Sequence, residues 1–131
     1  MTLLDTNVVI HCLKGREPAT SRFRAAEPSE IAIPSVVGYE LEYGTPRIAS
    51  PQRRRILLRM LQSLEEIPFD REAARESARA RVELERRGIV IGPLDLVIAG
   101  TALSRGAALA INNTREFSRI RGLRLEDWTA P

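Results

Sequence analysis

The stretch "IGPLDLVIAGTAL", residues 91–103, decides how this chain is interpreted. Its last ten side chains are apolar or small, except for Asp95 and Thr101. An ionised carboxylate in apolar surroundings is costly unless it is paired, hydrogen-bonded or bound to a metal ion. Pro93 suits the first position of a helix, however, and an acid in the first turn is favoured by the helix dipole. The stretch alone leaves both explanations of Asp95 open.

Length and composition indicate one globular domain. The chain has 131 residues, of which 44% are hydrophobic and 5% aromatic, and its formal net charge is +3. These values are typical of a single folded unit with its own core. We therefore expect one domain that covers residues 1–131.

Cysteine content and hydropathy bear on the compartment. Cys12 is the single cysteine, so neither an internal disulfide nor a zinc-type cysteine pair is expected. Residues 1–15 have no basic leader region, and Asp5 interrupts their apolar run. No window approaches the roughly 18 apolar residues of a membrane-spanning helix. We expect a cytoplasmic protein with no membrane segment.

Short apolar runs alternate with helical patterns along the chain, which is typical of a parallel α/β sheet. The expected strands are residues 2–5, 30–34, 67–69, 107–112 and 123–128. The expected helices are residues 8–14, 35–44, 51–66, 71–88, 93–105 and 114–120. The expected caps are Thr6 or Asn7 for the first helix, Ser35 for the second, Ser50 for the third and Asp70 for the fourth. In such a sheet, active sites lie in the crevice beyond the carboxyl ends of the strands.

Acidic and amide side chains gather at these strand ends. Asp5 ends the first strand, and Asn113 and Glu116 follow the strand 107–112. Asp95 opens the helix that precedes that strand, so its side chain is expected at the same edge. These residues should therefore face one crevice.

A further acid comes from the helix 35–44. Glu40 lies four residues after Val36 and three after Val37, so it shares their helix face. Glu42 turns to nearly the opposite side of the helix. Glu40 is therefore expected to point inward.

Three acids, Asp5, Glu40 and Asp95, are thus expected to converge from separate elements. Converging carboxylates repel one another unless a cation lies among them. Oxygen ligands without Cys or clustered His suit Mg2+ or Mn2+. The chemistry that follows is metal-assisted phosphoryl transfer.

Each acid also has a structural explanation. Asp5 can cap a helix, and Glu40 can lie at a rim with its carboxylate in water. Asn113 and Glu116 have the spacing of a capping box. The structural explanation needs all of these at once, which weakens it.

Four motifs in this order resemble those of PIN-domain ribonucleases, specifically the VapC-type toxins of bacterial type II toxin–antitoxin systems. They are "LLDTN", "SVVGYELEYG", "GIVIGPLDLVIAGTAL" and "INNTREFSRIRGLRLEDW". The resemblance covers the whole chain. It implies a PIN-like three-layer sandwich with a central parallel sheet flanked by helices.

The resemblance also implies a site. Asp5, Glu40 and Asp95 match the metal-binding acids of the family, and Glu116 matches a fourth, more variable catalytic acid. Thr6 matches a hydroxyl residue that supports the metal site, and Asn113 a supporting Asp or Asn position. One departure is Ile111, where relatives usually carry Thr, so the hydroxyl expected at that strand end is missing.

The activity implied is Mg2+- or Mn2+-dependent endonucleolytic cleavage of RNA that leaves a 3′-hydroxyl and a 5′-phosphate. The partners implied are a VapB-type antitoxin and a second copy of the chain in a homodimer. The segments "GPLD" and "NNTREF" resemble those of members that cleave initiator tRNA.

Other functions fit the residues less well. A phosphatase of the haloacid dehalogenase type needs an Asp two residues after Asp5, where this chain has Asn7. A phospho-receiver domain needs a lysine late in the chain, and the single lysine is Lys14. A catalytically inactive RNA- or antitoxin-binding module on the same fold stays open as the alternative to an enzyme.

Arginine supplies nearly all the positive charge, and two helices carry most of the candidates for phosphate contacts. The first set is Arg53, Arg54, Arg55 and Arg59, and the second is Arg71, Arg75 and Arg79. Either set can contact RNA phosphates. Glutamates interleave the second set, which favours a solvated, ion-paired face there.

Overall fold

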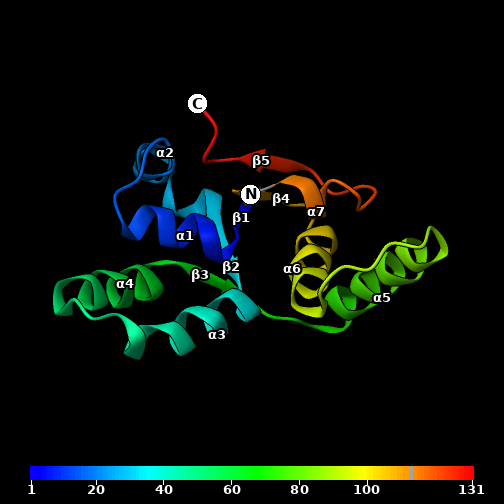
Figure 1. The fold of residues 1–131 in the computed structure, drawn as a ribbon, viewed down its shortest axis with the longest axis horizontal. Helices are drawn as coiled ribbons and strands as arrows, with labels where there is room; N and C mark the ends of the chain where they lie inside the picture. Colours follow the sequence, from blue (N-terminus) through cyan, green and yellow to red (C-terminus); the bar gives the residue numbers. More distant parts are fainter. Residues whose placement is uncertain (113) are drawn as a thin grey trace.

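A computed structural model describes residues 1–112 and 114–131 (Figure 1). Five strands form one parallel sheet in the order β3-β2-β1-β4-β5. The strands are β1 (Thr2–Leu4), β2 (Ile31–Pro34), β3 (Glu65–Ile67), β4 (Ala108–Ile111) and β5 (Leu125–Asp127). The parallel α/β sheet expected from the alternating pattern is confirmed.

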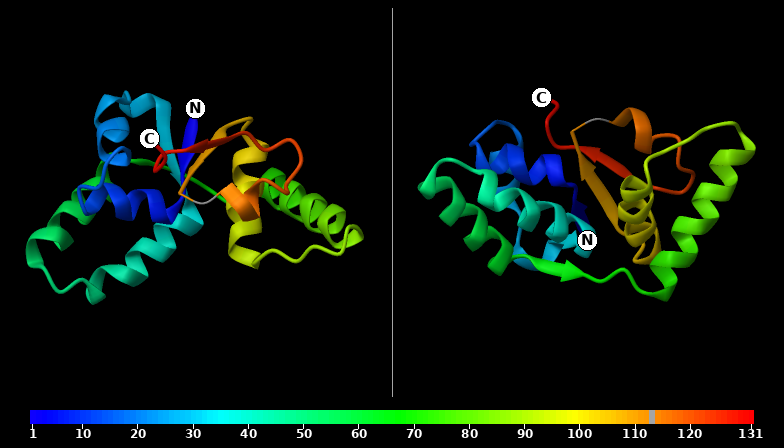
Figure 2. Two further views of the ribbon diagram at one scale, coloured as in Figure 1. Left: turned by 45° about the horizontal axis from the view of Figure 1, so that its top comes forward. Right: turned by 60° about the horizontal axis from the view of Figure 1, so that its bottom comes forward.

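Seven α-helices in the described part of the chain flank this sheet. They are α1 (Thr6–Leu13), α2 (Ala19–Ala25), α3 (Ser35–Gly44), α4 (Pro51–Ser63), α5 (Arg71–Arg86), α6 (Pro93–Ser104) and α7 (Thr114–Phe117). Helices α1 to α4 lie on one side of the central strands and α5 and α6 on the other, as Figures 1 and 2 show. None of the described helices is both long and apolar enough to cross a bilayer.

Burial explains the order of the strands. Strands β2 and β4 are buried along their whole length, as continuous apolar strands in the middle of a parallel sheet should be. The edge strands β3 and β5 carry exposed acidic residues instead. Leu3, Leu109 and Ile98 are completely or almost completely buried between sheet and helices, and Trp128 closes the core near the C-terminus.

Two of the expected capping residues set the starts of their helices, whereas Ser35 is the first residue of α3 and that helix has no side-chain cap. The Ser50 hydroxyl accepts a hydrogen bond from the Arg53 N–H at the start of α4, and Asp70 does the same for the Ala73 N–H in α5. Helix α5 gives way to Gly88, whose φ of +71° suits glycine at this position.

Several predicted boundaries were wrong. Helix α1 begins at Thr6 and is capped by Asp5, not by Thr6 or Asn7. The third strand covers Glu65–Ile67 and not residues 67–69, because the preceding helix ends at Ser63. Pairing with β2 places Glu65 and Glu66 on an exposed edge, where their charges stay in water. Helix α2 was not expected.

The order of the strands creates a crevice at one point of the sheet. Strands β1 and β4 are neighbours, but the chain leaves β1 towards β2 and leaves β4 towards β5. Connections that diverge in this way leave a gap beyond the carboxyl ends of the two strands. Asp5 directly follows β1, and its N–H donates to the carbonyl of Ala110 in β4 at 3.0 Å. Asp5 is therefore fixed at this gap.

Helices α5 and α6 pack closely because Gly100 has no side chain. A Cβ at Gly100 would lie 1.8 Å from the Ser77 Oγ and 2.8 Å from the carbonyl oxygen of Ala73. The Ser77 hydroxyl donates to the carbonyl of Leu96 at 3.0 Å and joins the two helices directly. This contact holds α6, and with it Asp95, against the rest of the molecule.

We predict that Gly100→Ala destabilises the protein by about 1–3 kcal/mol, because the methyl group meets backbone atoms that cannot yield. Gly44→Ala is the matched control, since nothing lies within 4 Å of a Cβ at Gly44. Urea unfolding of the two variants measures the difference. Equal free energies of unfolding for both variants would contradict the packing described here.

Candidate active site

Asp5 is a buried acid that the backbone holds in place. Only 7% of its surface is exposed, and its Oδ1 accepts a hydrogen bond from the Thr6 N–H at 2.8 Å. Burial, helped by the charges of Asp95 and Glu40, raises the pKa of Asp5 to about 6 against the opposing effect of that hydrogen bond. The Asp5 carboxylate that caps α1 is thus also the candidate metal ligand.

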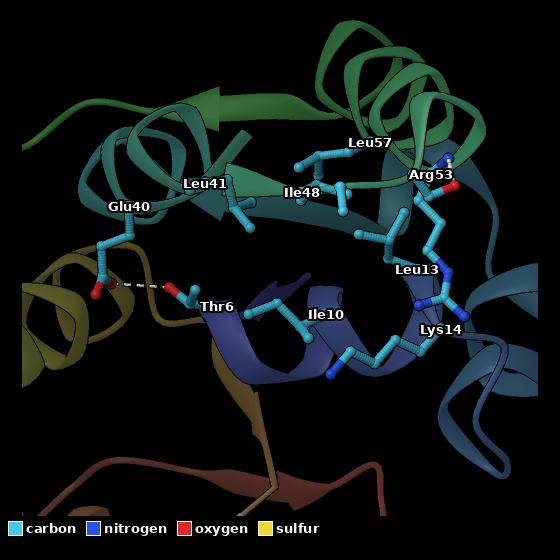
Figure 3. A pocket seen from close by; sticks show the side chains of 12 residues that line it. Thr6, Ile10, Leu13, Lys14, Glu40, Leu41, Ile48, Arg53 and Leu57 are labelled. Atoms are coloured by element: carbon cyan, nitrogen blue, oxygen red, sulfur yellow. Dashed lines mark hydrogen bonds between the residues drawn. The ribbon is translucent and has the colours of Figure 1, made fainter. Parts of the chain in front are cut away.

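Glu40 is oriented by a side chain from another helix. It lies half-buried on α3, and its Oε1 accepts a hydrogen bond from the Thr6 hydroxyl at 2.8 Å (Figure 3). Glu42 is exposed, as expected for the opposite face of the helix. Thr6 therefore contacts two acids, Asp5 through its N–H and Glu40 through its hydroxyl.

Asp95 completes the group from the opposite side of the molecule. It lies in the first turn of α6 and is partly buried. Burial raises its pKa above the usual range, and the nearby charges of Glu40 and Glu116 raise it further. The charges of Asp5, Glu40 and Asp95 thus lie near one another, and Glu116, which is exposed on α7, lies near Asp95. Asn113 lies outside the described residues.

The charge of this cluster is not neutralised within the described part of the chain. None of the ion pairs between described residues involves Asp5, Glu40 or Asp95. Nor do the described residues contain a group of three His, Cys, Asp or Glu side chains already placed to hold a metal ion. The donor set is nevertheless made of carboxylate oxygens and a hydroxyl, which is the chemistry that a hard divalent cation prefers.

Ile111 belongs to the core and not to the cluster. It ends strand β4 and is fully buried. The hydroxyl of Thr129 reaches the neighbouring position and donates to the carbonyl of Asn112 at 3.2 Å.

A groove of about 410 Å³ begins beside Thr6 and Glu40. Helices α1, α3 and α4 enclose it, and its floor is apolar. Floor residues include Ile10, Leu13, Leu41, Ile48 and Leu57. Lys14 and Arg53 lie at the end opposite Glu40 (Figure 3). Sequence reasoning missed this groove, because its walls come from separate elements and no local pattern joins them.

Comparison with known proteins agrees with this geometry. Residues 2–123 match the family model of the PIN domain. The chain is 39% identical over 129 residues to the tRNA(fMet)-specific endonuclease VapC of Shigella flexneri, with 97% of each chain covered. It is 34% identical to Ribonuclease VapC2 of Rickettsia felis, with 96% of each covered.

Solved structures with the same fold are toxin–antitoxin complexes. DNA-bound VapBC from Salmonella typhimurium superposes with a TM-score of 0.86 at 39% identity, and 97% of each chain is covered. VapBC2 from Rickettsia felis, bound to a DNA fragment from its promoter, gives a TM-score of 0.85 at 33% identity, with 97% of this chain and 98% of the other covered. Fold, site geometry and similarity agree that the chain belongs to the PIN-domain family, in its VapC group.

Proposed function

We propose that this protein is a divalent-metal-dependent endoribonuclease, the toxin of a toxin–antitoxin pair, and that residues 1–131 act as one PIN-like domain in the cytoplasm. The observation that carries the proposal is the group of three mutually repelling acids, Asp5, Glu40 and Asp95, at the switch point of the sheet, with Glu116 beside Asp95. Such a group costs stability unless a cation joins it. A role in holding a cation therefore explains why the folded protein contains this group.

Asp5, Glu40 and Asp95 would hold the ion, which is Mg2+ or Mn2+. When bound, the ion supplies activation of a water molecule and stabilisation of charge on the phosphate. Thr6 positions Glu40 by its hydroxyl and Asp5 by its N–H. Helix α6 carries Asp95 to the same crevice.

Glu116 and Asn113 act at the edge of the site in this proposal. Glu116 is exposed on α7, close enough to Asp95 to raise its pKa. An exposed carboxylate beside the ion can contact a solvent water molecule or the substrate. Asn113 is proposed as a supporting residue from its position in the sequence.

The substrate we propose is tRNA, with initiator tRNA as the specific target. Two relatives at 39% identity are named tRNA(fMet)-specific endonucleases, which supports this choice. Cleavage would leave a 3′-hydroxyl and a 5′-phosphate. These products form when water attacks the phosphorus and the bond between phosphorus and the 3′-oxygen breaks. The 3′-oxygen then gains a proton and becomes the 3′-hydroxyl.

A VapB-type antitoxin is the proposed inhibitor, and a homodimer of the toxin is the proposed state within the complex. Several solved structures of the same fold are VapBC complexes, which supports the partner. An Arg or Lys of the antitoxin would neutralise the acid cluster. The crevice would then be closed to metal and RNA.

We predict that the purified, antitoxin-free protein cuts a bacterial tRNA pool into discrete fragments with Mg2+ or Mn2+ and is inactive in chelator. Glu40→Gln and Asp95→Asn should each lower the rate by at least about 100-fold, because each removes a ligand charge. Gel analysis of the products measures the rates.

Glu42→Gln is the matched control for this experiment, because it makes the same change on the exposed face of the same helix. It should retain the wild-type rate. Full activity of both site variants, or cleavage in chelator, would refute the proposed site. A wild-type protein that binds tRNA but never cuts it would favour an inactive binding module.

We predict that Asp5→Asn stabilises the metal-free protein at neutral pH. The pKa of Asp5 is about 6 in the folded protein, against an ordinary value of 3.8, so the folded protein holds this proton more tightly than the unfolded chain does. The stability of metal-free wild type therefore falls as the pH rises from about 4 to about 6. At pH 7.5 the variant avoids a cost of up to about 3 kcal/mol, and at pH 4 the difference should vanish.

Thermal unfolding in chelator at both pH values tests this. Asp127→Asn is the control of opposite sign, because hydrogen bonds from Thr129 and Ala130 help to lower the pKa of Asp127. That variant should lose stability at pH 7.5. If Asp5→Asn is also less stable than wild type at pH 7.5, Asp5 is simply a structural cap.

A further inference from the structure

The arginines of the two long helices differ in how their charges are satisfied. Most of those on α5 and its C-cap form ion pairs. The pairs are Arg75–Glu72, Arg79–Glu76, Arg81–Glu85 and Arg87–Glu83. On α4, none of Arg53, Arg54, Arg55 and Arg59 is ion-paired with a residue that the structure describes. The ion-paired face expected for α5 is therefore present, and α4 carries charge that is open to a ligand.

The position of these arginines on α4 is electrostatically unfavourable for the protein alone. The first turn of α4 contains no acidic residue, and Arg53, Arg54 and Arg55 follow its first two residues directly. Cations at the N-terminal end of a helix are repelled by the helix dipole. Helix α5 has the opposite arrangement, with Asp70 and Glu72 at its start and Arg86 in its last turn. A negatively charged ligand would relieve the repulsion on α4.

Arg53 also connects this surface to the groove of the candidate site. Its side chain and that of Lys14 lie together at one end of the groove, and Glu40 lies at the other (Figure 3). Lys14 is exposed, and among the described residues it has no ion-pair partner. Two cations placed side by side without an acid between them form a site for an anion.

We propose that Lys14 and Arg53 bind a backbone phosphate of the RNA, so that the strand runs from the acid cluster along the groove and onto α4. This assignment rests on the proposed ribonuclease function. With a divalent ion among the acids, both ends of the groove attract phosphate. The apolar floor between them, formed in part by Leu13 and Ile48, suits the face of a base or ribose.

Charge complementarity favours RNA over a peptide as the occupant. Helix α4 carries three further arginines, Arg54, Arg55 and Arg59, none of which is ion-paired with a residue that the structure describes. Arg54 adjoins Arg53, while Arg55 and Arg59 turn towards the outer face of the helix. Repeated negative charge along a strand matches such a series of cations.

Binding of fluorescently labelled tRNA in chelator tests the assignment without any need for cleavage. Combined Lys14→Gln and Arg53→Gln should weaken the affinity about tenfold and reduce the salt slope by about one per lost phosphate contact. Combined Arg75→Gln and Arg79→Gln removes the same charge from α5 and is the matched control, expected within about twofold of wild type. Circular dichroism and thermal unfolding check that both variants fold.

In cleavage assays, the Lys14 and Arg53 variant should raise KM with little change in kcat. An equal loss of affinity in both double variants would reduce the effect to net charge and overturn the assignment. Unchanged tRNA affinity with weaker antitoxin binding would overturn it in favour of a peptide site. A wild-type protein that binds tRNA but never cuts it, even with Mg2+ or Mn2+, would refute the proposed function, while the two variants would still test this surface.

Discussion

The contact between Thr6 and the two acids Asp5 and Glu40 is the constraint on which the rest of the site depends. The Thr6 N–H donates a hydrogen bond to the carboxylate of Asp5, which caps α1. The Thr6 hydroxyl donates a hydrogen bond to Glu40 on α3. One residue therefore ties the end of the central strand, the start of α1 and the middle of α3 together. Because Asp5 is buried, this arrangement forces negative charges close to each other. A folded protein tolerates such a cost where function requires it.

The sheet determines where that cost arises. Strands β1 and β4 are neighbours whose connections diverge, and this opens a crevice at their carboxyl ends. The close packing of α6 on α5 through Gly100 brings Asp95 to the same place. Beyond the crevice, the groove changes from acids at one end to Lys14 and Arg53 at the other. The resulting surface suits a ligand that carries phosphates and needs a cation at one of them.

Much of this could be predicted from local patterns. The alternation of apolar runs and helices predicted the parallel sheet, Ser50 and Asp70 predicted two helix starts, and the spacing within α3 placed Glu40 inward. The exposed edge strand was displaced in the prediction because Glu65 and Glu66 carry no apolar signal. The groove was missed because α1, α3 and α4 meet only in the folded chain. The ion pairs of the arginines could likewise be predicted only in part. A helical pattern shows which residues are neighbours on one helix, but not which residues of other elements lie around it.

Calorimetric titration with Mn2+ at pH 7.5 tests the central claim, that the buried acids are tolerated because they hold a divalent cation. We expect saturable binding to the wild type and an affinity at least about tenfold weaker in Asp5→Asn. Equal binding by the two proteins, or no binding by the wild type, would contradict this claim. In that case the acid cluster would need another explanation.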